Sequence, residues 1–293
     1  MGRTDEVTVS VQLFTPSVTG DTRVISDRAW RRSRGLVGRG WLRLVSPVVL
    51  IGIWQVLSAT GVLPPSRLAS PVSIAHTAYN LVVVNSPAYG TLQGSLLVSS
   101  ERWGIGFSLG VVIALILAVL SGLSGIGEYA LDPVMNALRS VPLLGLLPLF
   151  IVWFGIGDLP KDLIVLLGAL FPMYINTFAG IRSVDGKLAE VGRVLHLRRG
   201  ELIRHVVLPG ALPQMFVGLR LSLGAAWLAL VVAEQINASA GLGYMINQAE
   251  QFDRNDVIFV CLLVYCVLGL LTDALVRLLE RRALAWRRGF LEQ

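Results

Sequence analysis

Long apolar stretches, each about as long as a bilayer is thick, recur along this chain and constrain its fold more than any other feature. A helix needs about 20 predominantly apolar residues to cross the hydrocarbon core of a membrane. Six such stretches occur, at residues 44–63, 92–120, 129–155, 163–181, 215–236 and 257–275. Because a helix pairs its own backbone groups in lipid, we expect an all-α integral membrane protein with about six transmembrane helices.

The distribution of charge agrees with this interpretation. Hydrophobic residues make up 54% of the chain and charged residues 15%, more apolar than a water-soluble core of this size requires. The net charge of +6 does not indicate a nucleic-acid partner, because the arginines gather beside the apolar stretches, at 23–43, 182–204 and 277–288. Basic residues flanking membrane segments are typical of the cytoplasmic side. Six crossings would place both termini there, in a multi-pass protein of the bacterial plasma membrane.

The chain therefore divides into five predicted parts. They are a cytoplasmic basic tail (1–43), the first transmembrane helix (44–63), an extracytoplasmic linker segment (64–91), a membrane core (92–282) and a short cytoplasmic tail (283–293). Within the linker segment, Pro71 and Pro87 are expected to act as helix breaks. The residues between 236 and 257 are expected to form a loop.

The third stretch, 129–155, contains Pro133, Pro142 and Pro148. Proline frees backbone carbonyls that lipid cannot satisfy, so we expect one kinked helix that is buried among other helices or lies beside a water-lined path. Arg139 is expected to snorkel to the inner surface.

Spacings of four residues indicate two local contacts. Gly106 and Gly110 would let two helix backbones approach closely. Asp273 and Arg277 would form an ion pair along one helix.

Three polar residues in the membrane core are candidates for the translocation pathway: Tyr174, Asn176 and Glu234. Tyr174 and Asn176 could face a pore, or they could form hydrogen bonds between helices. Glu234 could line the pathway or fasten an outer gate, because a carboxylate in the membrane needs a cavity or a partner. By the predicted boundaries, however, it lies close to the outer interface, where plain solvation would explain it, and this is the favoured interpretation.

A charged segment at 187–209 interrupts the apolar pattern. Its apolar residues recur every three to four positions, at Leu188, Val191 and Val194 and again after Leu202, which predicts two short amphipathic helices. Gly200 is expected to turn the chain between them, and Pro209 to end the second helix. The predicted product is a basic hairpin at the membrane surface.

This hairpin resembles the EAA loop of binding-protein-dependent ABC importer permeases. The similarity lies in Glu190-Val191-Gly192, in Val206-x-Leu208-Pro209 and in the gap between them. Val191-Gly192 stands where the family has Ala-Ala, and His196 where it has glycine. Two further segments, 131–185 and 232–246, resemble the branch of the family that imports aliphatic sulfonates, taurine and nitrate.

The resemblance, which covers about residues 92–282, implies a type I (MetI-like) importer fold. It implies a permease pair, often a homodimer, with two ABC ATPase subunits and an extracytoplasmic solute-binding protein. The hairpin, with its loop at 185–210, would couple to the ATPase. The residues that would carry this coupling are Glu190, Val191, Gly192, Arg193, His196, Gly200, Leu208 and Pro209. A basic loop that binds anionic lipid headgroups is the alternative.

The chain has no G-x-x-x-x-G-K-[ST] phosphate loop, so we expect no enzyme activity and no cofactor here, with ATP and Mg²⁺ bound by the partner ATPase. Cys261 and Cys266 share one apolar stretch and suggest no metal site. A small, anionic solute is the expected substrate, although the sequence shows no convincing arginine in mid-membrane. The alternatives are a permease for another small solute, such as a pyrimidine precursor, or a secondary transporter. An intramembrane enzyme would need paired acids or histidine clusters, which are not evident.

Overall fold

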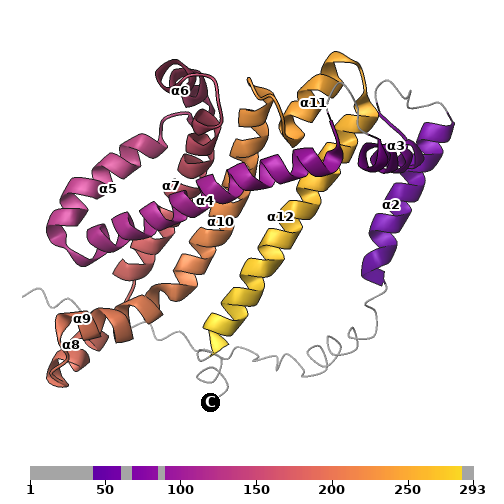
Figure 1. The fold of residues 1–293 in the computed structure, drawn as a ribbon. Coiled ribbons are helices and arrows are strands. Elements are labelled where there is room, and N and C mark those ends of the chain that lie inside the picture. The colour runs from indigo at the N-terminus through magenta and orange to yellow at the C-terminus, as the bar shows by residue number, and fades with distance from the viewer. Residues whose placement is uncertain (1–41, 61–67, 85–89, 286–293) are drawn as a thin grey trace, which may run out of the picture. The chain divides into compact units, whose positions relative to one another are not determined.

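The computed structural model describes residues 42–60, 68–84 and 90–285, and this part of the chain is built from helices (Figure 1). The predicted all-α class is confirmed. Most of the two predicted tails lies outside the described residues. The elements are α2 (Leu42–Ala59), α3 (Pro71–Val83), α4 (Leu92–Leu123), α5 (Gly125–Arg139), η2 (Leu143–Leu146), α6 (Leu147–Phe154), α7 (Leu159–Arg182), α8 (Gly186–Val194), α9 (Arg199–Leu202), η3 (Ile203–Val207), α10 (Leu208–Gln235), α11 (Leu242–Gln251) and α12 (Asn255–Ala283).

The chain divides into two units, residues 1–52 and 53–293. The described part of the first unit is the start of α2. All helices from α3 onward belong to the second unit, which is the subject of the following paragraphs.

Four helical stretches in the described residues are long and apolar enough to cross a membrane: α4, α7, α12 and the continuous stretch Arg199–Gln235. The helices α5 and α6 supply a fifth crossing if they are taken together. The apolar part of α2 that can be judged, Val48–Ala59, is shorter than a full crossing requires. The helices also extend beyond the predicted stretches, so that α12 continues to Ala283.

The third predicted crossing is not one kinked helix. The chain ends α5 at Arg139 and resumes with η2 and α6, and the two halves differ in direction by 88° (Figure 1). Pro142 stands at the break and disfavours α geometry in the residue before it, while Pro148 fits the first turn of α6. Two prolines placed this way separate helices rather than bend one.

The predicted position of Arg139 is wrong. Glu128, in the first turn of α5, pairs with Arg182 at the end of α7, where the chain enters the 187–209 hairpin. Helix α5 therefore starts at the hairpin end of the bundle, and Arg139 lies at its other end. Snorkelling to the hairpin side would require the side chain to span the whole length of α5.

Helices α4, α7 and α10 pack closely because small residues lie between them. A Cβ atom added to Gly106 would lie 2.7 Å from the Cβ atom of Val165 in α7, and one on Gly110 would lie 3.0 Å from that of Ala169. A Cβ atom on Gly168 of α7 would lie 3.2 Å from that of Ala229 in α10. The predicted close approach at Gly106 and Gly110 is confirmed, and α7 is the helix that α4 and α10 share.

An aromatic row ties α12 to this core. The rings of Trp103 and Phe107 in α4 stack at 4.6 Å, and Trp103 stacks on Trp227 of α10 at 4.7 Å. Tyr265 of α12 meets Trp227 edge-on. The row fixes the Tyr265 side chain beside the end of α10.

Two segments predicted to be irregular contain helices. Pro71 opens α3 instead of breaking a helix, because the first turn tolerates proline and the Ser70 hydroxyl accepts a hydrogen bond from Ser73 N–H at 3.1 Å. Pro87 lies outside the described residues. Helix α11 occupies much of the loop predicted between 236 and 257, with one side buried through residues such as Met245.

The predicted ion pair near the end of α12 is confirmed. A guanidinium nitrogen of Arg277 lies 2.5 Å from a carboxylate oxygen of Asp273. Arg220 of α10 reaches the same carboxylate at 3.2 Å, so this exposed pair also links two helices.

Candidate functional site

The hairpin is formed by α8 and by a second helical segment that runs without interruption into α10. Helix α9 passes into the π-helical turn η3, where Leu208 N–H bonds to the carbonyl of Ile203, and α10 follows directly. Pro209 directly follows this π-helical turn, and the helix continues through it. The prediction that Pro209 ends the second helix is therefore wrong.

The turn between α8 and α9 is made by His196. Its φ is +57°, in the left-handed region, and Leu197 N–H bonds to the carbonyl of Gly192 at 3.0 Å. This six-residue closure is the Schellman arrangement that ends many helices, usually with glycine at the left-handed position. Gly200 instead lies inside α9, so its predicted role as the turn residue is wrong. The family's glycine position is the one that needs a positive φ, and here histidine occupies it.

Gly192 has a different task in the hairpin. A Cβ atom at this position would lie 2.5 Å from the Cδ1 atom of Leu202, so the absence of a side chain lets α8 touch the second helical segment. Gly192 is itself buried. The glycine therefore keeps the two arms of the hairpin in contact.

One face of α8 presents apolar side chains to the surroundings. Val191 is 56% exposed, Val194 76% and Leu195 67%, and the neighbouring Glu190 and His196 are exposed as well. We call these five residues the α8 patch. A cluster of exposed apolar side chains within a charged segment is typical of a protein contact surface.

The other predicted coupling residues lie apart from this patch. Gly200 is exposed on α9, whereas Leu208 and Pro209 are half-buried at the start of α10. The side chain of Arg193 lies outside the described residues. The structure thus brings together Glu190, Val191 and His196, and adds Val194 and Leu195 to them.

The substitution His196→Gly is expected to stabilise the hairpin by about 1 kcal/mol, because a side chain in the left-handed region costs about 1–2 kcal/mol that glycine avoids, less the greater flexibility of an unfolded glycine. Amide hydrogen exchange over residues 186–202 should slow about fivefold. The substitution Gly200→Ala, within α9, is the matched comparison and should leave the exchange of α8 unchanged. Faster exchange in His196→Gly would contradict the turn described above.

A second constellation surrounds Glu234, near the end of α10. The residue is fully buried, and its carboxylate accepts a hydrogen bond from Arg102 of α4 at 2.8 Å. Ser99 Oγ lies 2.9 and 2.7 Å from the two carboxylate oxygens, and Tyr265 donates its hydroxyl at 3.1 Å. Gly243 N–H completes the set at 3.0 Å. One carboxylate therefore joins α4, α10, α11 and α12.

The segment after α10 is shaped to enclose this carboxylate. Gly241 has a φ of +119°, and a Cβ atom there would lie 2.5 Å from the Glu234 Oε1 atom. A Cβ atom on Gly243 would approach the Glu234 Cβ atom equally closely. Both glycines let the backbone wrap around the carboxylate, which excludes water from it.

Arg102 extends this network toward α7. Besides Glu234, its guanidinium binds Asp158 at 2.7 Å and the carbonyl of Ala240 at 2.7 Å. Asp158 is largely exposed at the turn between α6 and α7, and Lys161 approaches it to 3.9 Å. We call Ser99, Arg102, Asp158, Glu234 and Tyr265 the Glu234 cluster. A buried charge pair of this kind needs its hydrogen bonds to offset the loss of hydration.

The interpretation that solvation explains Glu234 is therefore wrong, since no part of its side chain reaches the surface. Sequence reasoning also missed Arg102 as its partner. Arg102 and Glu234 are opposite charges in two different apolar stretches, and this pattern could have suggested that they pair. A fastening role near the end of the bundle opposite the hairpin remains a prediction.

The other pathway candidates bond between helices. Tyr174 is buried and its hydroxyl donates to Ser121 of α4 at 3.1 Å. Asn176 accepts a hydrogen bond from Gln214 of α10 at 3.1 Å. These contacts correspond to the interhelical alternative, and a role in the pathway stays a prediction.

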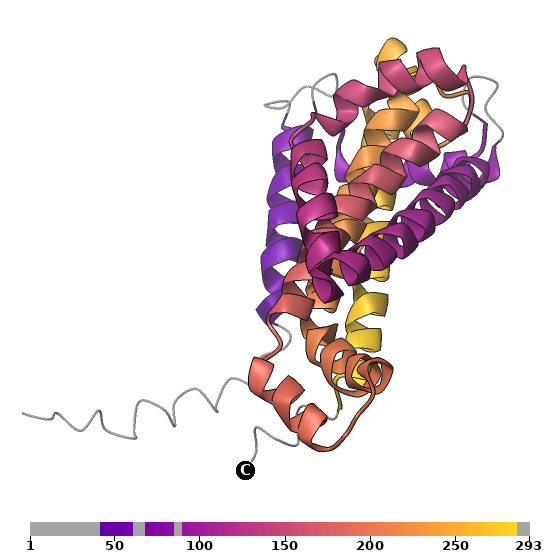
Figure 2. The same ribbon diagram turned by 90° about the vertical axis from the view of Figure 1, so that its left-hand side faces the viewer.

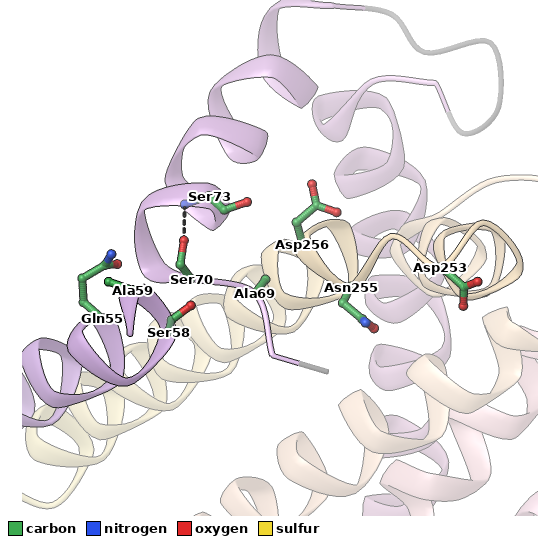
Figure 3. Close-up of a pocket in the computed structure, with 9 residues that line it drawn as sticks. All are labelled: Gln55, Ser58, Ala59, Ala69, Ser70, Ser73, Asp253, Asn255 and Asp256. Carbon is green, nitrogen blue, oxygen red and sulfur yellow. Dashed lines mark hydrogen bonds between the residues drawn. The ribbon is translucent and has the colours of Figure 1, made fainter. Parts of the chain in front are cut away.

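A polar cavity of about 350 Å³ lies at the end of the bundle that holds α11 (Figure 3). Its walls come from the end of α2, the start of α3 and the turn before α12, with Gln55, Ser73 and Asp256 among them. Asp256 is engaged by Thr77 at 2.6 Å and by Arg254 at 2.8 Å. The Asp256 carboxylate at the cavity wall is therefore already engaged by hydrogen bonds.

Comparisons with known proteins agree with these features. Residues 106–284 match the family described as "Binding-protein-dependent transport system inner membrane component". The chain is 46% identical to a putative aliphatic sulfonates transport permease protein of Bacillus subtilis, over 89% of this chain and 94% of that protein. It is 43% identical to the protein of the same description in Escherichia coli, over 85% and 95%.

The fold is also that of a solved transporter. An amino acid ABC transporter crystallised with histidines shares it with a TM-score of 0.55 and 18% identity, over 72% of this chain and 97% of the solved chain. At this identity the likeness concerns the fold alone.

Proposed function

Because this chain belongs to the family of binding-protein-dependent transport system inner membrane components, we propose that it forms the path by which an ATP-driven importer takes up an aliphatic sulfonate or a similar small anion. The chain is a multi-pass membrane permease of the ABC importer type, and ATP hydrolysis resides in a separate subunit. Support for the substrate class comes from the relatives with 46% and 43% identity, both described as aliphatic sulfonate permeases.

The α8 patch is the proposed docking surface for the ATPase. Exposed Val191, Val194 and Leu195 would be covered by an apolar groove on the partner, and Glu190 and His196 would form polar contacts at its edge. Two features support this role: the patch carries exposed apolar side chains although it lies in a charged segment, and Gly192 lets α8 contact Leu202 of the second arm. In this arrangement the hairpin and both termini are cytoplasmic.

The remaining partners follow from the same proposal. Two ATPase subunits, which bind ATP and Mg²⁺, would serve two permease copies that form a homodimer. A solute-binding protein would deliver the anion at the opposite end, where α3, α11 and the polar cavity lie (Figures 1 and 3). The Glu234 cluster would hold the outer ends of α4, α10 and α12 together while the inner ends move.

Uptake in proteoliposomes tests this function. The permease would be reconstituted with its ABC ATPase and its solute-binding protein, and radiolabelled ethanesulfonate would be supplied outside. We expect uptake that requires internal ATP and the binding protein. Unlabelled orotate, a pyrimidine precursor, should not compete with the labelled ethanesulfonate. An importer of pyrimidine precursors would accept orotate and would therefore show competition.

Three outcomes would contradict the proposal. Uptake driven by an ion gradient without ATP would indicate a secondary transporter. Competition by orotate as strong as that by unlabelled ethanesulfonate would move the substrate class to pyrimidine precursors. A complex that binds the ATPase but transports neither ethanesulfonate nor orotate would show that the substrate belongs to another chemical class.

A further inference from the structure

Arg139 lies at the end of α5 that is farther from the hairpin. Helix α5 starts at the hairpin end, where Glu128 pairs with Arg182, and Arg139 is its last residue. Fifteen helical residues span about 22 Å at 1.5 Å per residue. The hydrocarbon core is about 30 Å thick, so a helix of this length that entered it near Glu128 would carry Arg139 beyond its middle.

Arg139 occupies the inner face of α5. It follows Met135 by four residues and Asp132 by seven, so the three share one face of the helix. Met135 is buried, and Asp132 accepts a hydrogen bond from Tyr174 of α7 at 3.4 Å. By contrast, Val134 is 53% exposed on another side of α5. By its register, Arg139 therefore lies on the face of α5 that packs against the bundle, and not on the face of Val134.

Arg139 is nevertheless exposed, and it is the last residue of α5, after which the chain turns by 88° into η2 and α6 (Figure 2). Within the described residues it forms no hydrogen bond or ion pair through its side chain. The acids on the same face are already engaged: Glu128 by Arg182, and Asp132 by Asn136 and Tyr174. A charged residue at this depth is costly unless it faces water or binds an opposite charge.

We propose that Arg139 is an anion-binding residue of the translocation path, where its guanidinium donates paired hydrogen bonds to the oxygens of a sulfonate in transit. The planar fork of a guanidinium matches such oxygens better than the point charge of a lysine does. Its exposed position just before the break would let the anion reach it from an aqueous space on the inner face of α5. The inference rests on the proposed function and assigns the charged group that an anionic substrate requires.

Uptake by substituted complexes gives the first test. In the reconstituted complex, Arg139→Gln should lower the uptake of ethanesulfonate at subsaturating concentration at least tenfold, and Arg139→Lys less severely. Complex assembly, followed by size-exclusion chromatography, and basal ATP hydrolysis should not change. Arg281→Gln, which removes an exposed arginine at the end of α12, is the matched control and should transport normally. Uptake by Arg139→Gln equal to that of the unmodified protein would overturn the inference.

Chemical labelling separates substrate binding from a structural role. In a background with Cys261→Ser and Cys266→Ser, Arg139→Cys should react with the anionic, membrane-impermeant thiol reagent MTSES, and ethanesulfonate should slow the reaction. No reaction, or reaction unaffected by ethanesulfonate, would overturn the inference even if Arg139→Gln transports poorly. If the unmodified complex shows no ATP-driven uptake of ethanesulfonate, the proposed function has failed. This measurement on the unmodified complex comes first, so a failure of the proposed function is distinguished from a failure of the inference about Arg139.

Discussion

The substitution Glu234→Ala is expected to destabilise the permease by about 3–5 kcal/mol, because Arg102 would keep its charge in a buried position without its carboxylate partner. Ser99, Tyr265 and Gly243 N–H would lose their acceptor in the same step. The measurement is the temperature at which the purified protein loses its monodisperse peak in size-exclusion chromatography. We expect this temperature to fall by several degrees and expression in the membrane to drop.

Asp273→Ala is the matched control. It also removes a carboxylate that two arginines contact, but the group is partly exposed, so the expected loss is about 0–1 kcal/mol. Glu234→Gln, which keeps an acceptor for Tyr265 and Ser99, should fall between the two. Equal stability of Glu234→Ala and Asp273→Ala would show that the buried pair does not hold these helices together.

The substitution Glu190→Arg is expected to lower ATP-driven uptake at least tenfold while membrane insertion stays intact. Glu190 is an exposed member of the α8 patch, and reversing its charge places an arginine at the proposed edge of the ATPase contact. A tenfold loss of association corresponds to about 1.4 kcal/mol, a modest demand for a charge reversal at an interface. Uptake and co-purification of the ATPase would be measured on the same membranes.

Glu250→Arg provides the comparison for this experiment. Glu250 is exposed on α11, at the other end of the bundle, so the same change of charge should leave ATPase association normal. Normal uptake by Glu190→Arg would remove this residue from the coupling contact. A failure of Glu190→Arg to enter the membrane would show a folding defect instead.

Hydropathy predicted most of the architecture because lipid imposes one rule on every crossing helix. The small-residue spacing at Gly106 and Gly110 and the pair Asp273–Arg277 followed from helical geometry alone. The segment 129–155 was predicted as one kinked helix, but it forms two separate helical parts. A helix can accommodate a single proline as a kink, whereas here Pro142 lies at the break and Pro148 lies in the first turn of a new helix that runs in another direction.

The Glu234 cluster could not be derived from local pattern. Burial of Glu234 depends on Arg102, more than 100 residues earlier, and on a backbone that two glycines fold around the carboxylate. The turn at His196 was missed for a related reason. Propensity favours Gly200, but the left-handed position is fixed by where the last turn of α8 ends.

Helix α10 starts at the hairpin and ends at the Glu234 cluster, so a single rod about 42 Å long connects the two. Under the proposed function, a movement of the ATPase that tilts the hairpin end of α10 must move the other end of α10 in the opposite direction, or it must bend the chain at the π-helical turn η3. A movement of the hairpin that is driven by ATP hydrolysis would then be transmitted along α10 to the Glu234 cluster at its other end.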